Sequence, residues 1–337
     1  MTTTPTKQHS HHTTDQPYYR RGLFGGTAEL NNALVVTAAR SVTTIGGDGV
    51  LDFAIRLRNH LGAEGYIHID NLARDLGASP EQIQPVLDRL VDAGALCRSA
   101  ERYASAVLIA AARAGNQVSD DVIAKRFSTT HVSLVARPGS HLAATIAQAA
   151  AELGIQVQMT TKVDCEADLK VVVANSFHDK HLFNANRIAL ADATPWLPVI
   201  AYDSDTAWVG PFVVPHQSAC LTCLQLRRSA NFSDDVFRPE LLKIEPVDDP
   251  APETGPNPVH YLQAGIVANF LMERVGLHDY APSAAPGGIT SIRINDSGLS
   301  MEYRRIFRVP RCPSCSPVAD TGFPQVWFHA PAREGER

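Results

Sequence analysis

The chain has 337 residues, of which 45% are hydrophobic and 19% charged, and its formal net charge is −5. This composition is typical of an ordinary globular protein with room for two domains. The negative charge argues against broad affinity for nucleic acid, because a phosphate-binding surface needs clustered lysine and arginine. No run approaches the roughly 20 apolar residues that span a bilayer, and no signal peptide is visible, so we expect a cytoplasmic protein without membrane contacts.

The first 105 residues carry the pattern of a small winged-helix domain. Residues 1–17 are polar, and we expect a disordered tail there. Three apolar stretches then predict strands and three helices follow, the last of which begins with Ser79, Pro80 and Gln82 in the order of a capping box. The strands are expected at residues 18–26, 32–39 and 40–47, the helices at 48–61, 69–77 and 78–96, and the wing at 98–103.

A winged helix usually binds DNA, but the charges of this one argue against that function. Residues 48–105 hold nine acidic residues and six arginines, which gives 6 − 9 = −3. The helix that would enter the groove carries Glu81, Asp88 and Asp92 against Arg89, and such a helix would repel phosphate. Two readings remain open: the strands capture an extended peptide by β-augmentation, or the domain only packs on its neighbour.

After a helical linker at residues 106–130, strands alternate with helices, which is the pattern of an α/β domain with a mostly parallel sheet. We expect this domain at residues 131–320, followed by a C-terminal tail at 321–337. Residues 229–258 are acidic and proline-rich and predict a mobile loop or crossover. The strands are expected at 131–136, 156–161, 169–175 and 196–202, the helices at 141–155, 183–192 and 259–276, and a hairpin at 291–310.

The first strand-to-helix turn of this domain is the place where a nucleotide would bind. Its sequence at residues 137–142 is RPGSHL, with a single glycine, Gly139, and with Pro138, which removes an amide donor. The pattern Gly-x-Gly-x-x-Gly is absent, and Asp164 is only a loose candidate for a ribose-binding acid. The turn therefore predicts a nucleotide-type fold that does not bind ATP, although Arg137 and Gly139 leave room for another anion.

Two Cys-x-x-Cys motifs hold four of the six cysteines: Cys220 with Cys223, and Cys312 with Cys315. Two disulfides or a redox-active pair are the alternatives, but a redox motif occurs once, and cytoplasmic thiols stay reduced. Four thiolates in two such motifs are typical of a closed, structural zinc site. Because the motifs are far apart in the sequence, zinc would tie the middle of the chain to its C-terminal part.

The stretches WLPVIAYDSDTAWVGPFVVPHQSACLTCLQLRR (196–228) and RVPRCPSCSP (308–317) resemble the E1-like, or ThiF-like, superfamily. More closely, the chain is similar to the ocin-ThiF-like proteins of azoline and azole peptide biosynthesis, which act with YcaO-type cyclodehydratases. The resemblance implies a winged-helix peptide-recognition domain at residues 18–105 followed by a Rossmann-like E1-type domain with four zinc-binding cysteines. It covers nearly the whole chain after the tail.

In that family the N-terminal domain binds the leader of a ribosomally made precursor peptide. The leader adds as a strand to the third strand and lies against the third helix. The resemblance thus implies a non-catalytic scaffold that presents the peptide to the YcaO partner, which would perform the ATP-dependent chemistry, and it also implies a homodimer. Carried onto this sequence, the peptide-binding residues are Val42, Thr43, Thr44 and Ile45 of the strand and Gln84, Leu87, Asp88 and Val91 of the helix.

Two other functions stay open on the sequence alone. An E1-like enzyme could itself adenylate a carboxylate on a peptide or a carrier protein, but it would need a working Mg-ATP site. A winged-helix regulator would bind DNA, against which the acidic third helix argues.

Overall fold

The computed structural model describes residues 18–21, 27–30, 33–38, 41–93, 95–114, 117–231, 255–278, 281, 284–295 and 298–317. The expected tails at 1–17 and 321–337, and all but the ends of the expected loop at 229–258, lie outside the described residues. The chain divides into two compact units, Met1–Phe127 and Ser128–Arg337. None of the helices that the structure describes is long and apolar enough to cross a membrane.

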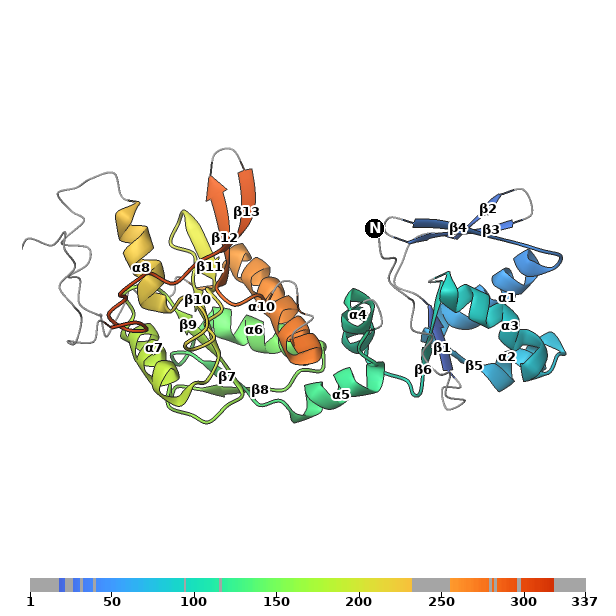
Figure 1. Ribbon diagram of the computed structural model, residues 1–337, viewed down its shortest axis with the longest axis horizontal. Helices are drawn as coiled ribbons and strands as arrows, with labels where there is room; N and C mark the ends of the chain where they lie inside the picture. Colours follow the sequence, from blue (N-terminus) through green and yellow to red (C-terminus); the bar gives the residue numbers. More distant parts are fainter. Residues whose placement is uncertain are drawn as a thin grey trace, which may run out of the picture. The chain divides into compact units, whose positions relative to one another are not determined.

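The first unit combines two small antiparallel sheets with helices in the order that the sequence predicts for a winged helix (Figure 1). One sheet has the strand order β2-β3-β4, and the other has the order β5-β1-β6. Strands β2 and β5 were not predicted. The elements are β1 (Tyr18–Arg21), β2 (Thr27–Leu30), β3 (Ala33–Ala38), β4 (Ser41–Gly46), α1 (Val50–Glu64), β5 (Tyr66–His68), α2 (Ile69–Leu76), α3 (Pro80–Asp92), β6 (Leu96–Ser99), α4 (Ser105–Arg113) and α5 (Asp120–Thr129).

Helix α3 begins where its capping signals predict. The Ser79 N–H donates to Gln82 Oε1 at 2.8 Å, and Pro80 occupies the first helical position, where no intrahelical partner for an N–H exists. Apolar residues recur along one side of the helix at the spacing of a buried stripe. The fully buried members are Ile83, Leu87 and Leu90, which pack in the core of the first unit with residues of α1, α2, β3, β4 and β6.

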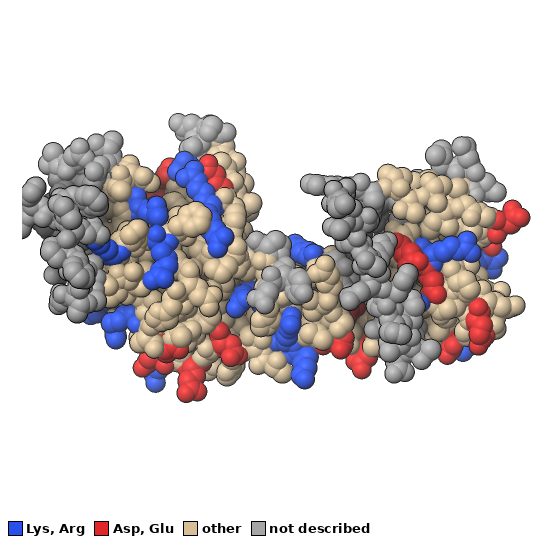
Figure 2. All heavy atoms as spheres, viewed as in Figure 1, with Lys and Arg blue, Asp and Glu red and all other residues tan. Residues whose placement is uncertain are grey.

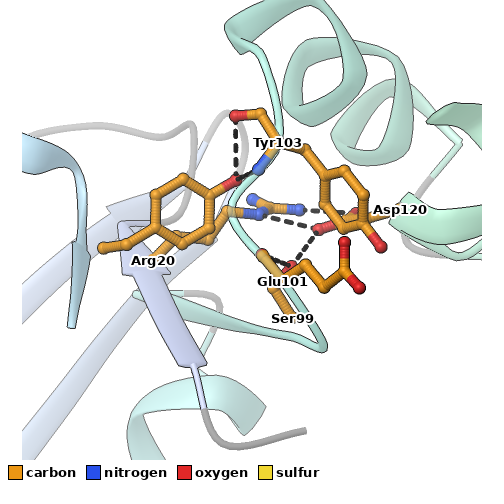
Figure 3. A network of polar contacts seen from close by, with 6 residues as sticks. Arg20, Ser99, Glu101, Tyr103 and Asp120 are labelled. Carbon is orange, nitrogen blue, oxygen red and sulfur yellow. Dashed lines mark hydrogen bonds and ion pairs between the residues drawn. The ribbon is translucent and has the colours of Figure 1, made fainter. Parts of the chain in front are cut away.

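A buried ion pair joins the first strand to α5 (Figure 3). The Arg20 guanidinium donates to both carboxylate oxygens of Asp120, at 3.2 and 3.1 Å, and the Arg20 side chain is only 1% exposed. Burial lowers the pKa of Arg20, but the hydrogen bond to Asp120 and the attraction of Cys97, Asp120 and Tyr66 together outweigh burial and hold this pKa above its ordinary value. Ser99 Oγ donates to Asp120 Oδ2 at 3.2 Å, so β6 joins the same network.

Because of this network, the start of α5 is part of the first unit. The residues expected as a linker, 106–130, form α4 and α5, and the first unit extends to Phe127. A second contact joins β5 to the segment before α4, because Tyr66 Oη accepts a hydrogen bond from the Tyr103 N–H at 3.1 Å. A sequence pattern cannot show such links, since Arg20 and Asp120 stand 100 residues apart.

The second unit is built on a seven-stranded mixed sheet with the order β13-β12-β11-β10-β9-β7-β8. Four strands, β8, β7, β9 and β10, are parallel, whereas β11, β12 and β13 form an antiparallel extension at one side. The expected mostly parallel sheet is therefore a mixed one, because the C-terminal hairpin joins it. The strands are β7 (Val132–Val135), β8 (Val157–Thr160), β9 (Leu169–Ala174), β10 (Trp196–Ile200), β11 (Thr206–Val209), β12 (Gly288–Asn295) and β13 (Gly298–Arg305).

Helices cover both faces of this sheet, with α7 and α8 on one side and α6 and α10 on the other (Figure 1). Strands β7, β9 and β10 are buried along their whole length, which explains their continuous apolar runs. Helix α8 was not predicted, because its sequence was interpreted only as a metal-binding turn. The helices are α6 (His141–Glu152), α7 (Lys180–Asp192), α8 (Leu221–Ala230) and α10 (Pro258–Leu277).

Candidate functional site

Four cysteines from two distant parts of the second unit meet in one cluster. Cys220 Sγ lies 3.8 Å from Cys223 Sγ and 3.7 Å from Cys312 Sγ, and Cys223 Sγ lies 3.5 Å from Cys315 Sγ. All four sulfurs lie within 4.8 Å of one another, and such a group could hold a metal ion. The structure therefore brings together the four residues that the two Cys-x-x-Cys motifs indicated.

The first motif lies at the start of α8, and the second lies in the turns that follow β13. Cys220 is the N-cap residue of α8, so Cys223 follows about one helical turn later on the same side. The sulfurs are enclosed by apolar side chains of Leu190, Leu226 and Val309. Water is thus largely kept from the sulfurs, which favours a metal bound by protein groups alone.

Polar contacts also join the two motifs. Thr222 Oγ1 and Ser314 Oγ lie 2.7 Å apart, which links the residue inside one motif to a residue inside the other. Arg308 donates to the Cys315 carbonyl oxygen at 2.6 Å and to the His216 carbonyl oxygen at 3.0 Å. Such outer contacts hold metal ligands in their orientation.

One of the four sulfur atoms, that of Cys223, is prepared for the thiolate form that a metal requires. Hydrogen bonding from the Cys220 thiol, joined by the Val309 N–H at 3.3 Å, lowers the pKa of Cys223 to about 4. The same shared proton and burial raise the pKa of Cys220. One thiolate is thus stabilised within the cluster, and a bound cation would stabilise the others in the same way.

The geometry of the cluster fits zinc. A tetrahedral site with Zn–S bonds of about 2.3 Å has sulfur-to-sulfur edges of about 3.8 Å. The three distances above, 3.5 to 3.8 Å, are close to this edge. An all-thiol donor set suits zinc or iron among the common metals, and four protein ligands leave no position for water or substrate.

Strand β4 carries the four strand positions implied for peptide binding. It pairs with β3 on one side, and none of the strands that the structure describes pairs with its other side. Val42 is 69% exposed and Thr44 is also exposed, whereas Ile45 is 8% exposed. Alternate residues therefore face solvent and core, as in a half-buried edge strand.

Strand β4 and helix α3 contribute to one apolar cluster. Ile45 and Leu87 both belong to it, and Val91 packs against it while partly exposed. Leu87 is 0% exposed, so its side chain supports α3 from within the core and offers no surface to a ligand.

The polar positions implied on α3 take part in a small network. Gln84 Nε2 donates to Tyr19 Oη and to Asp88 Oδ1, each at 2.7 Å. Asp88 Oδ1 also accepts from the Arg98 guanidinium, which comes from β6. These contacts fix both side chains on the outer part of α3, and a ligand that hydrogen-bonds to Asp88 would share it with Arg98.

The turn after β7 is the position where a nucleotide would be expected, and there an arginine forms an ion pair with a buried aspartate. Arg137 donates to the two carboxylate oxygens of Asp179 at 3.4 and 3.2 Å, and the Asp179 side chain is 1% exposed. Asp179 also caps α7 by accepting from the His181 N–H at 3.0 Å. Gly139 has a φ of 79°, and Ser140 caps α6 by accepting from Ala143. Sequence analysis missed Asp179, since only the arrangement of strands places the turn after β9 beside the turn after β7.

A scan against models of protein families finds no match. A search of curated proteins finds no match either. Solved structures do match. A "heterocyclase in complex with substrate and cofactor" is 20% identical, with a TM-score of 0.62 over 89% of this chain and 40% of that chain. The heterocyclase TruD is 22% identical, with a TM-score of 0.60 over 88% of this chain and 42% of that chain. Escherichia coli MccB, with succinimide, is 13% identical, with a TM-score of 0.53 over 89% of this chain and 100% of that chain.

These proteins share their fold with this chain. The predicted fold class, a small winged-helix domain followed by an α/β domain, is thereby confirmed. The chain spans about two fifths of the length of the two heterocyclases and the whole length of MccB.

Proposed function

We propose that this protein binds the leader of a ribosomally made precursor peptide and presents it to a YcaO-type cyclodehydratase for azoline or azole formation. The observation that carries the proposal is the free edge of β4. An edge strand offers a row of unpaired backbone donors and acceptors, to which an extended peptide can add as a further strand. The folds of heterocyclases and of MccB, one structure of which is in complex with N-formylated MccA, support the same role.

The side chains of β4 suit this mode of binding. Val42 and Thr44 are exposed and would contact alternate residues of the added strand, while Ile45 anchors β4 in the core. Thr43, on the inward side with Ile45, would contribute mainly through its backbone. Helix α3 would add Gln84, Asp88 and Val91, with Leu87 holding the helix in place from behind.

The turn after β7 supports a scaffold role, because its arginine is engaged in an ion pair within the protein. The Arg137 side chain directs donors to Asp179, and the turn has one glycine in place of a glycine-rich phosphate cradle. We infer that the four cysteines hold a structural zinc ion and that a separate YcaO partner performs the ATP-dependent step. A homodimer is part of the same proposal.

The mixed charge of the first unit agrees with a peptide ligand better than with DNA. Helix α3 exposes Glu81, Arg89 and Asp92, and Figure 2 shows acidic and basic side chains interspersed on the visible face of this unit. A DNA-reading helix would carry an excess of positive charge.

One observation favours a second candidate, an enzyme that adenylates a carboxylate. The chain covers the whole of MccB, which has also been solved with ATP, at 12% identity and a TM-score of 0.51. Fluorescence anisotropy of a labelled leader peptide, titrated with the protein in the presence and absence of Mg-ATP, separates the two candidates. Saturable binding that ignores Mg-ATP supports the scaffold, whereas binding or pyrophosphate release that needs Mg-ATP supports the enzyme.

A pair of proline variants tests the free edge of β4 directly. Of two neighbouring residues in an antiparallel strand, one directs its N–H to the paired strand and the other to the free edge. We therefore expect that one of Thr43→Pro and Thr44→Pro abolishes leader binding while the unit stays folded, and that the other mainly lowers its stability. Unchanged affinity in both variants, with folding checked by circular dichroism, would move the peptide site away from β4.

A further inference from the structure

Helix α8 carries an arginine that is packed between aromatic rings. Arg228 Cζ lies 3.6 Å from the centre of the Phe177 ring and 5.7 Å from that of Trp208. The two rings also contact each other edge-on, with centroids 5.7 Å apart and an interplanar angle of 70°. Gln225 donates to the Phe177 carbonyl oxygen at 3.2 Å, which fixes α8 against the loop that holds this ring. The three side chains thus form one pre-ordered cluster.

The cluster lies at the carboxyl ends of the parallel strands. Phe177 comes three residues after the end of β9, and Trp208 of β11 pairs with Ile200, the last residue of β10. In open α/β sheets, ligands bind at this edge. The cluster shares no residue with the Arg137–Asp179 ion pair or with the four cysteines.

Among the residues that the structure describes, the charge of Arg228 is only partly compensated. No carboxylate of the described residues forms an ion pair with it. Asp203 attracts it from nearby, but Asp203 Oδ1 already accepts from the Asp205 N–H at 3.1 Å and from the Thr206 N–H at 2.8 Å. Burial lowers the pKa of Arg228, and burial together with repulsion from Arg228 lowers the pKa of His178. A partly desolvated cation of this kind gains free energy when an anion joins it.

We propose that Arg228, Phe177 and Trp208 form a binding site for an oxyanion, either a carboxylate or a phosphate group. Arg228 Cζ lies over the Phe177 ring at 3.6 Å, and a guanidinium that stacks on a ring there would direct the N–H groups at its edge toward a carboxylate or a phosphate. The aromatic rings fix the guanidinium in place, so little conformational entropy is lost on binding. The site shares no residue with β4, the strand of the proposed leader site, because the two lie in different units of the chain.

Trp208 provides a direct probe of this site. The intrinsic fluorescence of the full-length protein would be titrated with inorganic phosphate, ATP, acetate and a short peptide bearing a free C-terminal carboxylate, with the C-terminal amide of that peptide as its control. Trp208→Phe keeps an aromatic ring and identifies the part of the signal that comes from this residue. We expect a saturable change from at least one of the four oxyanion probes. Response to phosphate and ATP alone assigns a phosphate site, and response to acetate or the free peptide, without the amide, assigns a carboxylate site.

Substitutions of Arg228 decide whether the cluster binds the anion. Arg228→Gln should weaken binding of the active probe roughly 10- to 100-fold, as for loss of a charged hydrogen bond, and Arg228→Lys should weaken it less. Arg187→Gln, a change at an exposed arginine of α7, is the matched control and should have no effect. No saturable response to any oxyanion probe, or equal affinity of wild type and Arg228→Gln measured calorimetrically, would overturn the proposal. Leader binding measured on the same variants should stay unchanged, so failure of this site is distinct from failure of the scaffold function.

Discussion

If the four cysteines hold the proposed zinc ion, its removal should destabilise the second unit strongly, because the four cysteines close a long loop. Cys220 and Cys312 stand 92 residues apart, and their sulfurs lie 3.7 Å from each other. A cross-link over a loop of this length lowers the entropy of the unfolded chain. The relation derived for disulfides gives about 4.6 kcal/mol at 25 °C for a loop of this size, and a metal that joins the same points acts on the unfolded chain in the same way.

This free energy converts to a large shift in melting temperature. The second unit has about 200 residues, and in domains of that size 1 kcal/mol corresponds to roughly 2–4 °C. The double variant Cys312→Ser/Cys315→Ser should therefore melt roughly 9–18 °C below wild type. Treatment of the wild type with a strong chelator should produce a shift in the same direction.

The measurement pairs calorimetry with metal analysis of the purified protein. We expect one zinc ion per chain in the wild type and none in the double variant. Cys165→Ser is the matched control, because Cys165 is partly buried and lies outside the cluster, and it should keep both the zinc and the higher melting temperature. A wild-type protein that contains no metal and melts at the same temperature as the double variant would refute the reasoning.

Three further predictions concern other contacts. Asp120→Asn leaves the buried Arg20 charge uncompensated and should lower the free energy of unfolding of the first unit by about 3–5 kcal/mol in urea titrations. Gly210→Ala places a Cβ 2.5 Å from the Gly288 carbonyl oxygen at a φ of 107°, and should cost about 3 kcal/mol or more by the same assay. Burial, with repulsion from Arg228, lowers the pKa of His178 in the folded protein, so the unfolded chain binds a proton first as the pH falls. Stability should therefore decline below about pH 6.5, and His178→Gln should flatten that decline; an unchanged pH profile would contradict it.

Short-range patterns in the sequence predicted most helices and strands correctly. They could not predict the contacts between residues that are distant in the sequence. Apolar runs identified β7, β9 and β10, and the capping residues Ser79 and Pro80 placed the start of α3. Strand β5 is only three residues long and β2 only four, so neither carries a periodic signal. The sheet order, which makes β4 an edge and joins the C-terminal hairpin to the parallel strands, depends on pairings that no local pattern encodes.

The candidate sites also differ in whether a short-range pattern in the sequence could predict them. The cysteine cluster could be predicted because each motif supplies two ligands at a fixed short spacing, and thiolates have few other uses in such pairs. The Arg228 cluster could not, because Phe177, Trp208 and Arg228 come from three separate elements and each residue type is common on its own. For Leu87, the family resemblance and the local pattern gave different predictions. The resemblance implied a contact with the peptide, whereas the position of Leu87 on the apolar stripe of α3 indicated the core, where the structure has it.

The turn after β7 differs from the glycine-rich turn that binds phosphate in nucleotide-binding folds. A glycine-rich turn leaves its amide groups free for phosphate, which stabilises the loop only when the nucleotide is bound. Here the turn is held by the protein itself, since Ser140 caps α6 and Arg137 pairs with the buried Asp179, which caps α7. Loss of Arg137 would leave the buried Asp179 carboxylate without this ion pair, so the pair contributes to the stability of the turn. The turn is thus ordered by the protein itself, which agrees with the proposal that the substrate peptide binds at β4 of the other unit.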